Sequence, residues 1–198
     1  MNTEILLFLI SSITLTLMPG PDILFVISQS ISKDRLTGVL ISLGLCSGLL
    51  IHTILIIFGL SSAISNNYFS FQLFSSFYLL FLVLQEINLL PNRYSSRRIF
   101  NFNSPYLKGL IMNLINPKVI LFFIAFFPAF LFSNTIDVKI QFGILGLIFF
   151  FQALIIFISV SYLSKKIFNS FNVSSKSAKT SYIKTLIYLL IIVLIWLD

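Results

Sequence analysis

The sequence contains few of the residues on which most enzymatic sites and soluble surfaces depend. Its 198 residues include one cysteine, Cys46, and one histidine, His52. An intrachain disulfide, a thiol relay and a histidine- or cysteine-based metal cluster are therefore excluded within one chain. Only 10% of the residues are charged, whereas about 25% is typical of soluble domains. Too little polar surface remains for a separate soluble domain, and we expect no cofactor.

Apolar residues take the place of the missing charges, at 58% of the chain with a mean hydropathy of +1.02. Six segments are candidates to span a hydrocarbon core that needs about 20 apolar residues. They are residues 4–28, 38–60, 70–90, 109–132, 141–163 and 183–197. The last is the shortest, which leaves open a five-helix topology with a peripheral final segment. We predict an all-α integral membrane protein with one membrane domain over residues 1–198.

Basic residues are concentrated between the apolar segments. The connections after the first, third and fifth segments hold 11 of the 13 Lys and Arg residues. Such residues stay on the cytoplasmic side, so both termini should face away from the cytoplasm in a multi-pass protein of the cytoplasmic membrane. This pattern explains the net charge of +7 better than nucleic-acid binding does. An anionic-lipid site is the alternative interpretation of the basic connections.

Two of the predicted helices are interrupted at proline. The run Met18-Pro19-Gly20-Pro21-Asp22 breaks the first segment, and Asn116-Pro117-Lys118 breaks the fourth. Proline removes a backbone donor, and in lipid the freed groups must find partners in protein or in a water-filled cavity. An ionisable side chain at mid-membrane costs about 2.5–3.5 kcal/mol on insertion scales, so it is a functional candidate.

The positions of these breaks predict two inverted repeats. Interrupted segments at corresponding positions of two halves are typical of transporter binding sites. With three helices per half, repeat one would occupy residues 1–90 and repeat two 109–198, separated by a basic cytoplasmic connection at 91–108. The first half then starts outside and the second starts inside, so the two repeats have opposite orientations.

Asp22 and Lys118 should lie at the same depth in the membrane. Asp22 precedes Lys33 by 11 residues, and Lys118 follows Lys108 by 10. At 1.5 Å per residue, both lie about 15 Å from the cytoplasmic boundary and close to the midplane. The two charges could bind the two ends of a zwitterion, and the half-helix after Pro21 would direct its positive end at a carboxylate. The alternative is a structural ion pair that joins the first and fourth helices.

Three further polar residues are weaker candidates for the same site. Asn113 lies one turn before Asn116, and the two either line a cavity or hydrogen-bond between helices. His52 is either a proton carrier or a hydrogen-bonded packing residue. Tyr78 either hydrogen-bonds a substrate or packs as one more aromatic side chain.

A glycine pattern in the second segment predicts a close helix contact. Gly44 and Gly48 form a G-x-x-x-G motif, which lets two helix backbones approach each other. We expect close helix packing, either within the chain or, as easily, between two copies. A homodimer that uses the same glycines stays open.

These motifs resemble those of the LysE/RhtB amino-acid exporters. The run Met18 to Asp22, followed by Gly38, Gly44, Gly48 and His52, is similar to the first half of that family. The second half of the family has a similar counterpart here, formed by Lys108-Gly109-Leu110, Asn113, Asn116-Pro117-Lys118, Phe122-Phe123 and Phe127-Pro128. The resemblance implies a six-helix secondary exporter of amino acids or related small metabolites in the inner membrane, driven by the proton motive force. It also implies that Asp22, Asn116 and Lys118 belong to the core site.

Other functional classes fit the residues less well. An intramembrane enzyme would need paired cysteines or clustered acids, and Asp22 is the only acid well inside a predicted helix. A transition-metal exporter is disfavoured by the single histidine and the absence of acidic clusters. The remaining alternative is a non-transporting scaffold or sensor derived from a transporter. Retained substrate binding would separate that alternative from the others.

Overall fold

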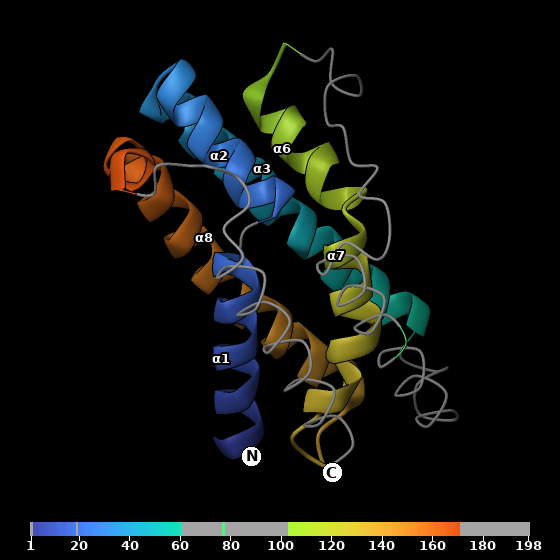
Figure 1. Cartoon of the computed structure of the whole chain (residues 1–198). Helices are drawn as coiled ribbons and strands as arrows, with labels where there is room; N and C mark the ends of the chain where they lie inside the picture. The colour runs from blue at the N-terminus through green and yellow to red at the C-terminus, as the bar shows by residue number, and fades with distance from the viewer. Residues whose placement is uncertain (1, 19, 61–76, 78–102, 171–198) are drawn as a thin grey trace.

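The computed structural model describes residues 2–18, 20–60, 77 and 103–170, and all regular elements within these ranges are helical (Figure 1). The first half contains, in order, α1 (Asn2–Leu17), α2 (Pro21–Ser32), α3 (Arg35–Leu55) and the π-helical turn η1 (Ile56–Leu60). The second half contains α6 (Pro105–Leu114), α7 (Pro117–Leu121), the π-helical turn η2 (Phe122–Phe126), the 3-10 turn η3 (Pro128–Phe130) and α8 (Val138–Ser170). Pro19, Tyr78, the predicted segments 70–90 and 183–197, and most of the connection 91–108 lie outside the described residues.

Several of these helices are apolar and long enough to cross a bilayer. Two do so alone, over Arg35–Gly59 and Val138–Ser164. Two further spans form if each bent pair is counted as one: Glu4–Leu17 with Pro21–Ser32, bent by 51°, and Pro105–Leu114 with Pro117–Ile124, bent by 49°. Both bends lie at the prolines that interrupt the apolar runs of the sequence, because a proline ring cannot continue the preceding helix.

The helix starts follow local capping chemistry. Asn116 accepts a hydrogen bond from the Lys118 backbone N–H, and Asp34 accepts one from Thr37 N–H. Ser104 caps α6 in the same way, with Pro105 at the first helical position. The fourth span therefore begins at residue 105 and not at 109 as predicted. The cap lies inside a polar stretch that hydropathy alone assigns to the connection.

Close backbone contact joins α3 to α6. A side chain at Gly44 would collide with the backbone carbonyl of Tyr106, and one at Gly109 would collide with the carbonyl of Ile41. Gly48 lies directly against the side chain of Asn113. The glycine motif of the second span is thus used for a contact within the chain, as small residues commonly are between membrane helices. The homodimer stays a prediction.

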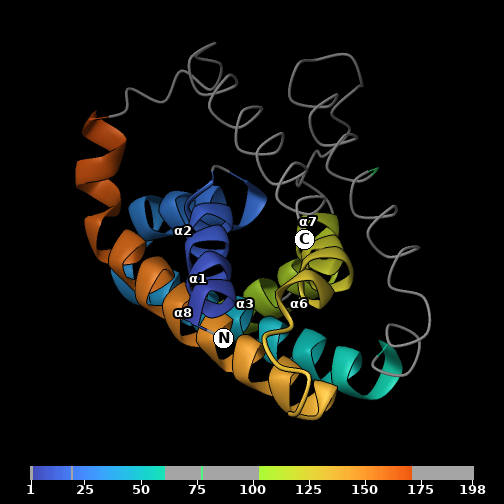
Figure 2. The ribbon, with the colours of Figure 1, turned by 90° about the horizontal axis from the view of Figure 1, so that it is seen from below.

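The unbroken helices α3 and α8 cross each other, and one bent span packs on each of them (Figures 1 and 2). The α1–α2 span packs on α8, while α6 packs on α3. Buried apolar side chains, among them Val26, Leu45 and Leu145, fill the space between these layers. The outward faces of α3 and α8 instead expose large apolar side chains such as Ile54 and Ile155, as expected of surfaces in contact with lipid.

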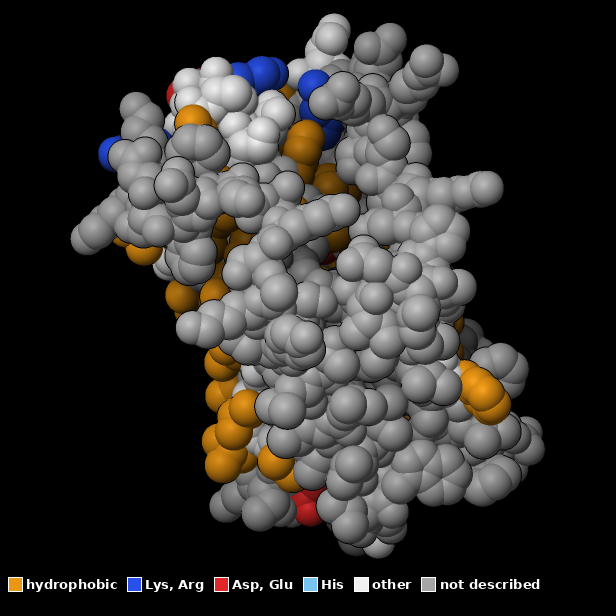
Figure 3. Space-filling view, viewed as in Figure 1, with side chains coloured by type: hydrophobic (Ala, Val, Ile, Leu, Met, Phe, Trp, Pro, Cys, Tyr) orange, Lys and Arg blue, Asp and Glu red, His pale blue; other side chains and the backbone are white. Residues whose placement is uncertain are grey.

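Apart from Asp22 and Lys118 at the two helix breaks, the charged side chains of the described residues lie near the ends of the spans. Lys33 follows α2, Arg35 begins α3 and Lys108 lies in the first turns of α6, so these three cations share one end of the molecule (Figure 3). Glu4 in α1 and Asp137 before α8 lie toward the opposite end. The intervening flank is apolar.

Candidate functional site

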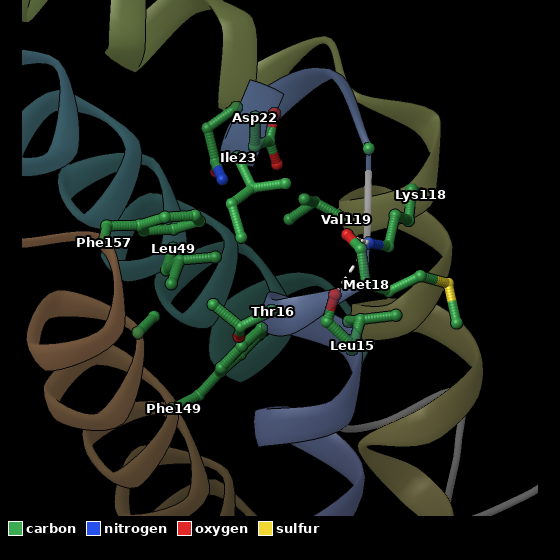
Figure 4. Close-up of a pocket in the computed structure, with 13 residues that line it drawn as sticks. Leu15, Thr16, Met18, Asp22, Ile23, Leu49, Lys118, Val119, Phe149 and Phe157 are labelled. Carbon is green, nitrogen blue, oxygen red and sulfur yellow. Dashed lines mark hydrogen bonds between the residues drawn. The ribbon is translucent and has the colours of Figure 1, made fainter. Parts of the chain in front are cut away.

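The two helix breaks lie against each other in the middle of the described structure (Figure 4). The Lys118 ammonium donates hydrogen bonds to the backbone carbonyls of Leu15, at 2.7 Å, and Met18, at 3.5 Å. The Asn116 amide Nδ2 donates to Asp22 Oδ2 at 2.8 Å. Three residues predicted from the sequence, Asp22, Asn116 and Lys118, therefore form one polar cluster that joins the first bent span to the second.

The position of the Lys118 ammonium follows from the broken helix opposite it. In a continuous helix, the Leu15 carbonyl would accept from the N–H of residue 19, but that residue is a proline and has none. The carbonyls at a helix C-terminus also carry partial negative charge. Lys118 begins in the first turn of α7, where the helix dipole disfavours a cation, and its long side chain reaches the end of α1, where a cation is favoured.

The second proline break also leaves a backbone carbonyl without its usual helical donor. Pro117 cannot donate to the Asn113 carbonyl, which instead accepts from Asn116 N–H at 3.1 Å and from His52 Nε2 at 3.4 Å. The His52 ring also packs on Phe123, with 5.3 Å between the ring centroids. His52 therefore binds the C-terminal end of α6. Its side chain does not line the cavity described below.

Asn116 uses both ends of its carboxamide. Its Oδ1 accepts from the Lys118 backbone N–H at 3.0 Å and so caps α7, while its Nδ2 binds Asp22. The side chain is buried, at 4% exposure. It therefore fixes the start of α7 relative to the start of α2, and the two charged residues that follow Pro21 and Pro117 are held next to each other.

A small cavity opens between the breaks. Its volume is about 20 Å³, which is room for about one or two water molecules. Asp22, Lys118, Asn113 and Thr16 contribute its polar lining, and Gly20 lies beside them. The apolar lining comes from Leu15, Met18, Ile23, Leu49, Val119, Phe149, Ala153 and Phe157. One end of the cavity is therefore charged and hydrogen-bonding, and the rest is hydrocarbon.

Two buried oxygens at this cavity have no hydrogen-bond partner among the described residues. They are Asp22 Oδ1 and Asn113 Oδ1. A buried acceptor without a partner costs about 1–3 kcal/mol, and more when it is charged, so such atoms need an explanation. Asp22 is electrostatically coupled to Lys118. The free carboxylate oxygen can accept a hydrogen bond from a ligand without breaking the bond to Asn116.

Helix α8 contributes a wall that the sequence reasoning missed. Phe149, Ala153 and Phe157 recur every fourth residue and so share one helix face, which lines the cavity. Next to them, Gln152 donates to the Thr16 hydroxyl at 3.0 Å and links α8 to the last turn of α1. The only sequence signal for this link was a glutamine within an apolar run.

An aromatic cluster borders the cavity on the side where α1 begins. Phe8 packs edge-on against Phe127 with ring centroids 5.3 Å apart, and Phe122 lies 4.9 Å from Phe149. All four side chains are at most 4% exposed. Because Phe149 also lines the cavity, this cluster separates the polar site from the N-terminal end of α1.

Comparisons with known proteins agree with this architecture. The profile of the LysE type translocator family matches residues 13–196. Leucine efflux proteins of Salmonella typhimurium, Salmonella typhi and Salmonella choleraesuis are each 30% identical to the chain over 145 residues, which is 70% of this chain and 68% of theirs. No solved structure shows a significant match.

The family match covers nearly the whole chain, including both breaks and the polar cluster between them. LysE-type translocators are transporters and not enzymes, and the apolar helices fit a multi-pass membrane protein. The chain belongs to the LysE type translocator family.

Proposed function

We propose that the protein is a secondary transporter that exports amino acids across the cytoplasmic membrane, driven by the proton motive force. The observation that carries the proposal is the pair of opposite charges, Asp22 and Lys118, held at two facing helix breaks. The leucine efflux activity named for the Salmonella relatives supports an amino acid as the substrate. The scaffold alternative predicts binding without transport.

We further propose six helices in two inverted repeats, 1–90 and 109–198. Three features support this arrangement. The bends of the first and fourth spans are nearly equal, at 51° and 49°. Each second half-helix begins with proline followed by a charged residue, Pro21-Asp22 and Pro117-Lys118. The first bent span packs mainly on α8 and the second on α3, a pairing that a twofold axis in the membrane plane would produce, although α2 also packs on α3.

To bind an amino acid, the site would exchange hydrogen bonds within the protein for hydrogen bonds to the substrate. The substrate ammonium would donate to Asp22 Oδ1, which has no hydrogen-bond partner within the described part of the chain. The substrate carboxylate would bind Lys118, whose ammonium now donates to the Leu15 and Met18 carbonyls. Charge-assisted hydrogen bonds to both ends of a zwitterion are stronger than neutral ones, which favours this exchange.

Substrate binding would also have to open the site. The cavity of about 20 Å³ has room for water but not for an amino acid, so the half-helices must separate. The aromatic cluster around Phe122 and Phe127 closes the side that the charge distribution assigns to the exterior. We propose that the site opens first to the cytoplasm, that one repeat then rocks against the other, and that Asp22 carries the coupling proton on return.

Amino-acid efflux from cells loaded with dipeptides tests the proposal. We compare the wild type with Asp22→Asn and Lys118→Gln at matched membrane levels, and use Lys139→Gln as a control because its side chain is exposed outside the site. We expect the wild type and the control to release one or a few amino acids, and both site variants to lose this release. A protonophore should abolish the wild-type release. Equal efflux by wild type and Asp22→Asn would contradict the role of the site.

A further inference from the structure

The side-chain end of the proposed substrate site is formed mainly by one face of α8. Phe149, Ala153 and Phe157 line the cavity at successive turns, and their side chains are 3%, 0% and 4% exposed. Between two phenylalanine rings, Ala153 contributes only a methyl group, so the wall recedes at this turn. Leu49 from α3 and Ile23 from α2 complete the apolar surroundings (Figure 4).

Lys118 lies at the other side of the same cavity, and Asp22 lies between the two sides (Figure 4). Figure 4 shows Lys118, Met18 and Leu15 on one side, with Leu49 and Phe157 facing them across the space. An α-amino acid whose two charged groups are held by Asp22 and Lys118 must direct its side chain away from the helix breaks. The apolar wall centred on Ala153 is the surface that such a side chain meets.

We propose that Ala153 determines which side chains are exported, by setting the room available for an aliphatic side chain. The proposal rests on the proposed export function. Ala153 has no charge and no side-chain hydrogen-bonding group, so its influence is through volume. One methylene of misfit in an apolar pocket changes discrimination by about 10- to 200-fold, which is large enough to measure in transport.

A graded series at this position tests the proposal. Cells producing wild type, Ala153→Cys, Ala153→Val or Ala153→Leu are loaded with leucine- and alanine-containing dipeptides, and efflux of both amino acids is measured at matched membrane levels. We expect the ratio of leucine to alanine efflux to fall with each increase in volume, by about 10-fold or more in Ala153→Leu. Ile155→Phe is the matched control, because it adds bulk to α8 at a side chain that is 67% exposed.

Two results would overturn the proposal. One is an unchanged leucine-to-alanine ratio throughout the series, and the other is an equal loss of both amino acids in Ala153→Val. If Ala153→Leu does not reach the membrane, the cysteine and valine variants still report the ratio. Failure of the export function itself looks different, because the wild type would then release no amino acid and the ratio would have no reference.

Discussion

Substitutions of Asn116 separate its two contacts and test how the two breaks are held together. Asn116→Ser keeps a good helix cap but removes the amide that reaches Asp22. Asn116→Ala removes both contacts. Asn116→Asp keeps the cap and replaces the donor with a carboxylate next to the carboxylate of Asp22. All three changes are made at a side chain that is only 4% exposed.

The expected magnitudes differ enough to rank the variants. A hydrogen bond to a charged group contributes about 1.5–3 kcal/mol, whereas interhelical bonds between membrane helices average about 0.6 kcal/mol. The bond to Asp22 Oδ2 is charge-assisted and short, at 2.8 Å, so we take the larger range for Asn116→Ser. Loss of the cap adds about 1 kcal/mol in Asn116→Ala. We expect Asn116→Asp to be at least as unstable as Asn116→Ser, because like charges then meet.

Equilibrium unfolding with SDS, added to protein in a mild detergent and followed by circular dichroism, measures these free energies. Exposed Asn134→Ser serves as the matched control. The double variant Asp22→Asn, Asn116→Asp exchanges donor and acceptor, so it should recover part of the stability that Asn116→Asp loses. A double-mutant cycle gives the coupling between the two side chains.

Two outcomes would refute this reasoning. In the first, Asn116→Asp unfolds at the same SDS fraction as the wild type, which would mean that the Asp22 contact contributes nothing. Alternatively, a coupling free energy below about 0.5 kcal/mol would show that the two breaks are independent. Either result would also remove the physical basis for a shared site.

Two further predictions concern the frame around the site. Gly44→Leu should destabilise the protein by about 1–3 kcal/mol or more, because the new side chain meets the Tyr106 carbonyl. Gly59→Ala should be neutral in the same SDS titration, because its new methyl group meets no described atom. Gln141→Leu should leave the N–H groups of Phe132 and Ser133 without their acceptor at about 1–3 kcal/mol each, and limited proteolysis should then cut the 131–137 loop faster than in Lys139→Gln.

The sequence predicted the breaks well because their causes are local. Pro21 and Pro117 cannot continue a helix in any packing arrangement, so both bends were expected before any tertiary contact was known. A depth argument placed Asp22 and Lys118 together, since equal distances from the basic connections put residues of different spans at one level. The family resemblance added Asn116.

The partners within the site could not be predicted in the same way. Nothing near Lys118 in the sequence indicates that its ammonium binds carbonyls about one hundred residues earlier, because that contact depends on how the two bent spans cross. The contribution of α8 was missed for a related reason. A helix that is apolar on all sides gives no periodic signal to identify the face bearing Phe149 and Ala153.

At each break, a proline leaves one backbone carbonyl without its usual helical donor. The two carbonyls are bound by different side chains. The Leu15 carbonyl is bound by a flexible lysine, whereas the Asn113 carbonyl is bound by His52, whose ring packs at a tilt against Phe123. A lysine ammonium at the end of four methylenes can turn to an arriving carboxylate, but a packed imidazole cannot leave without opening a gap in the core. We therefore expect the contacts of the first break, where α1 ends, to change during transport, and the second break to provide a fixed support.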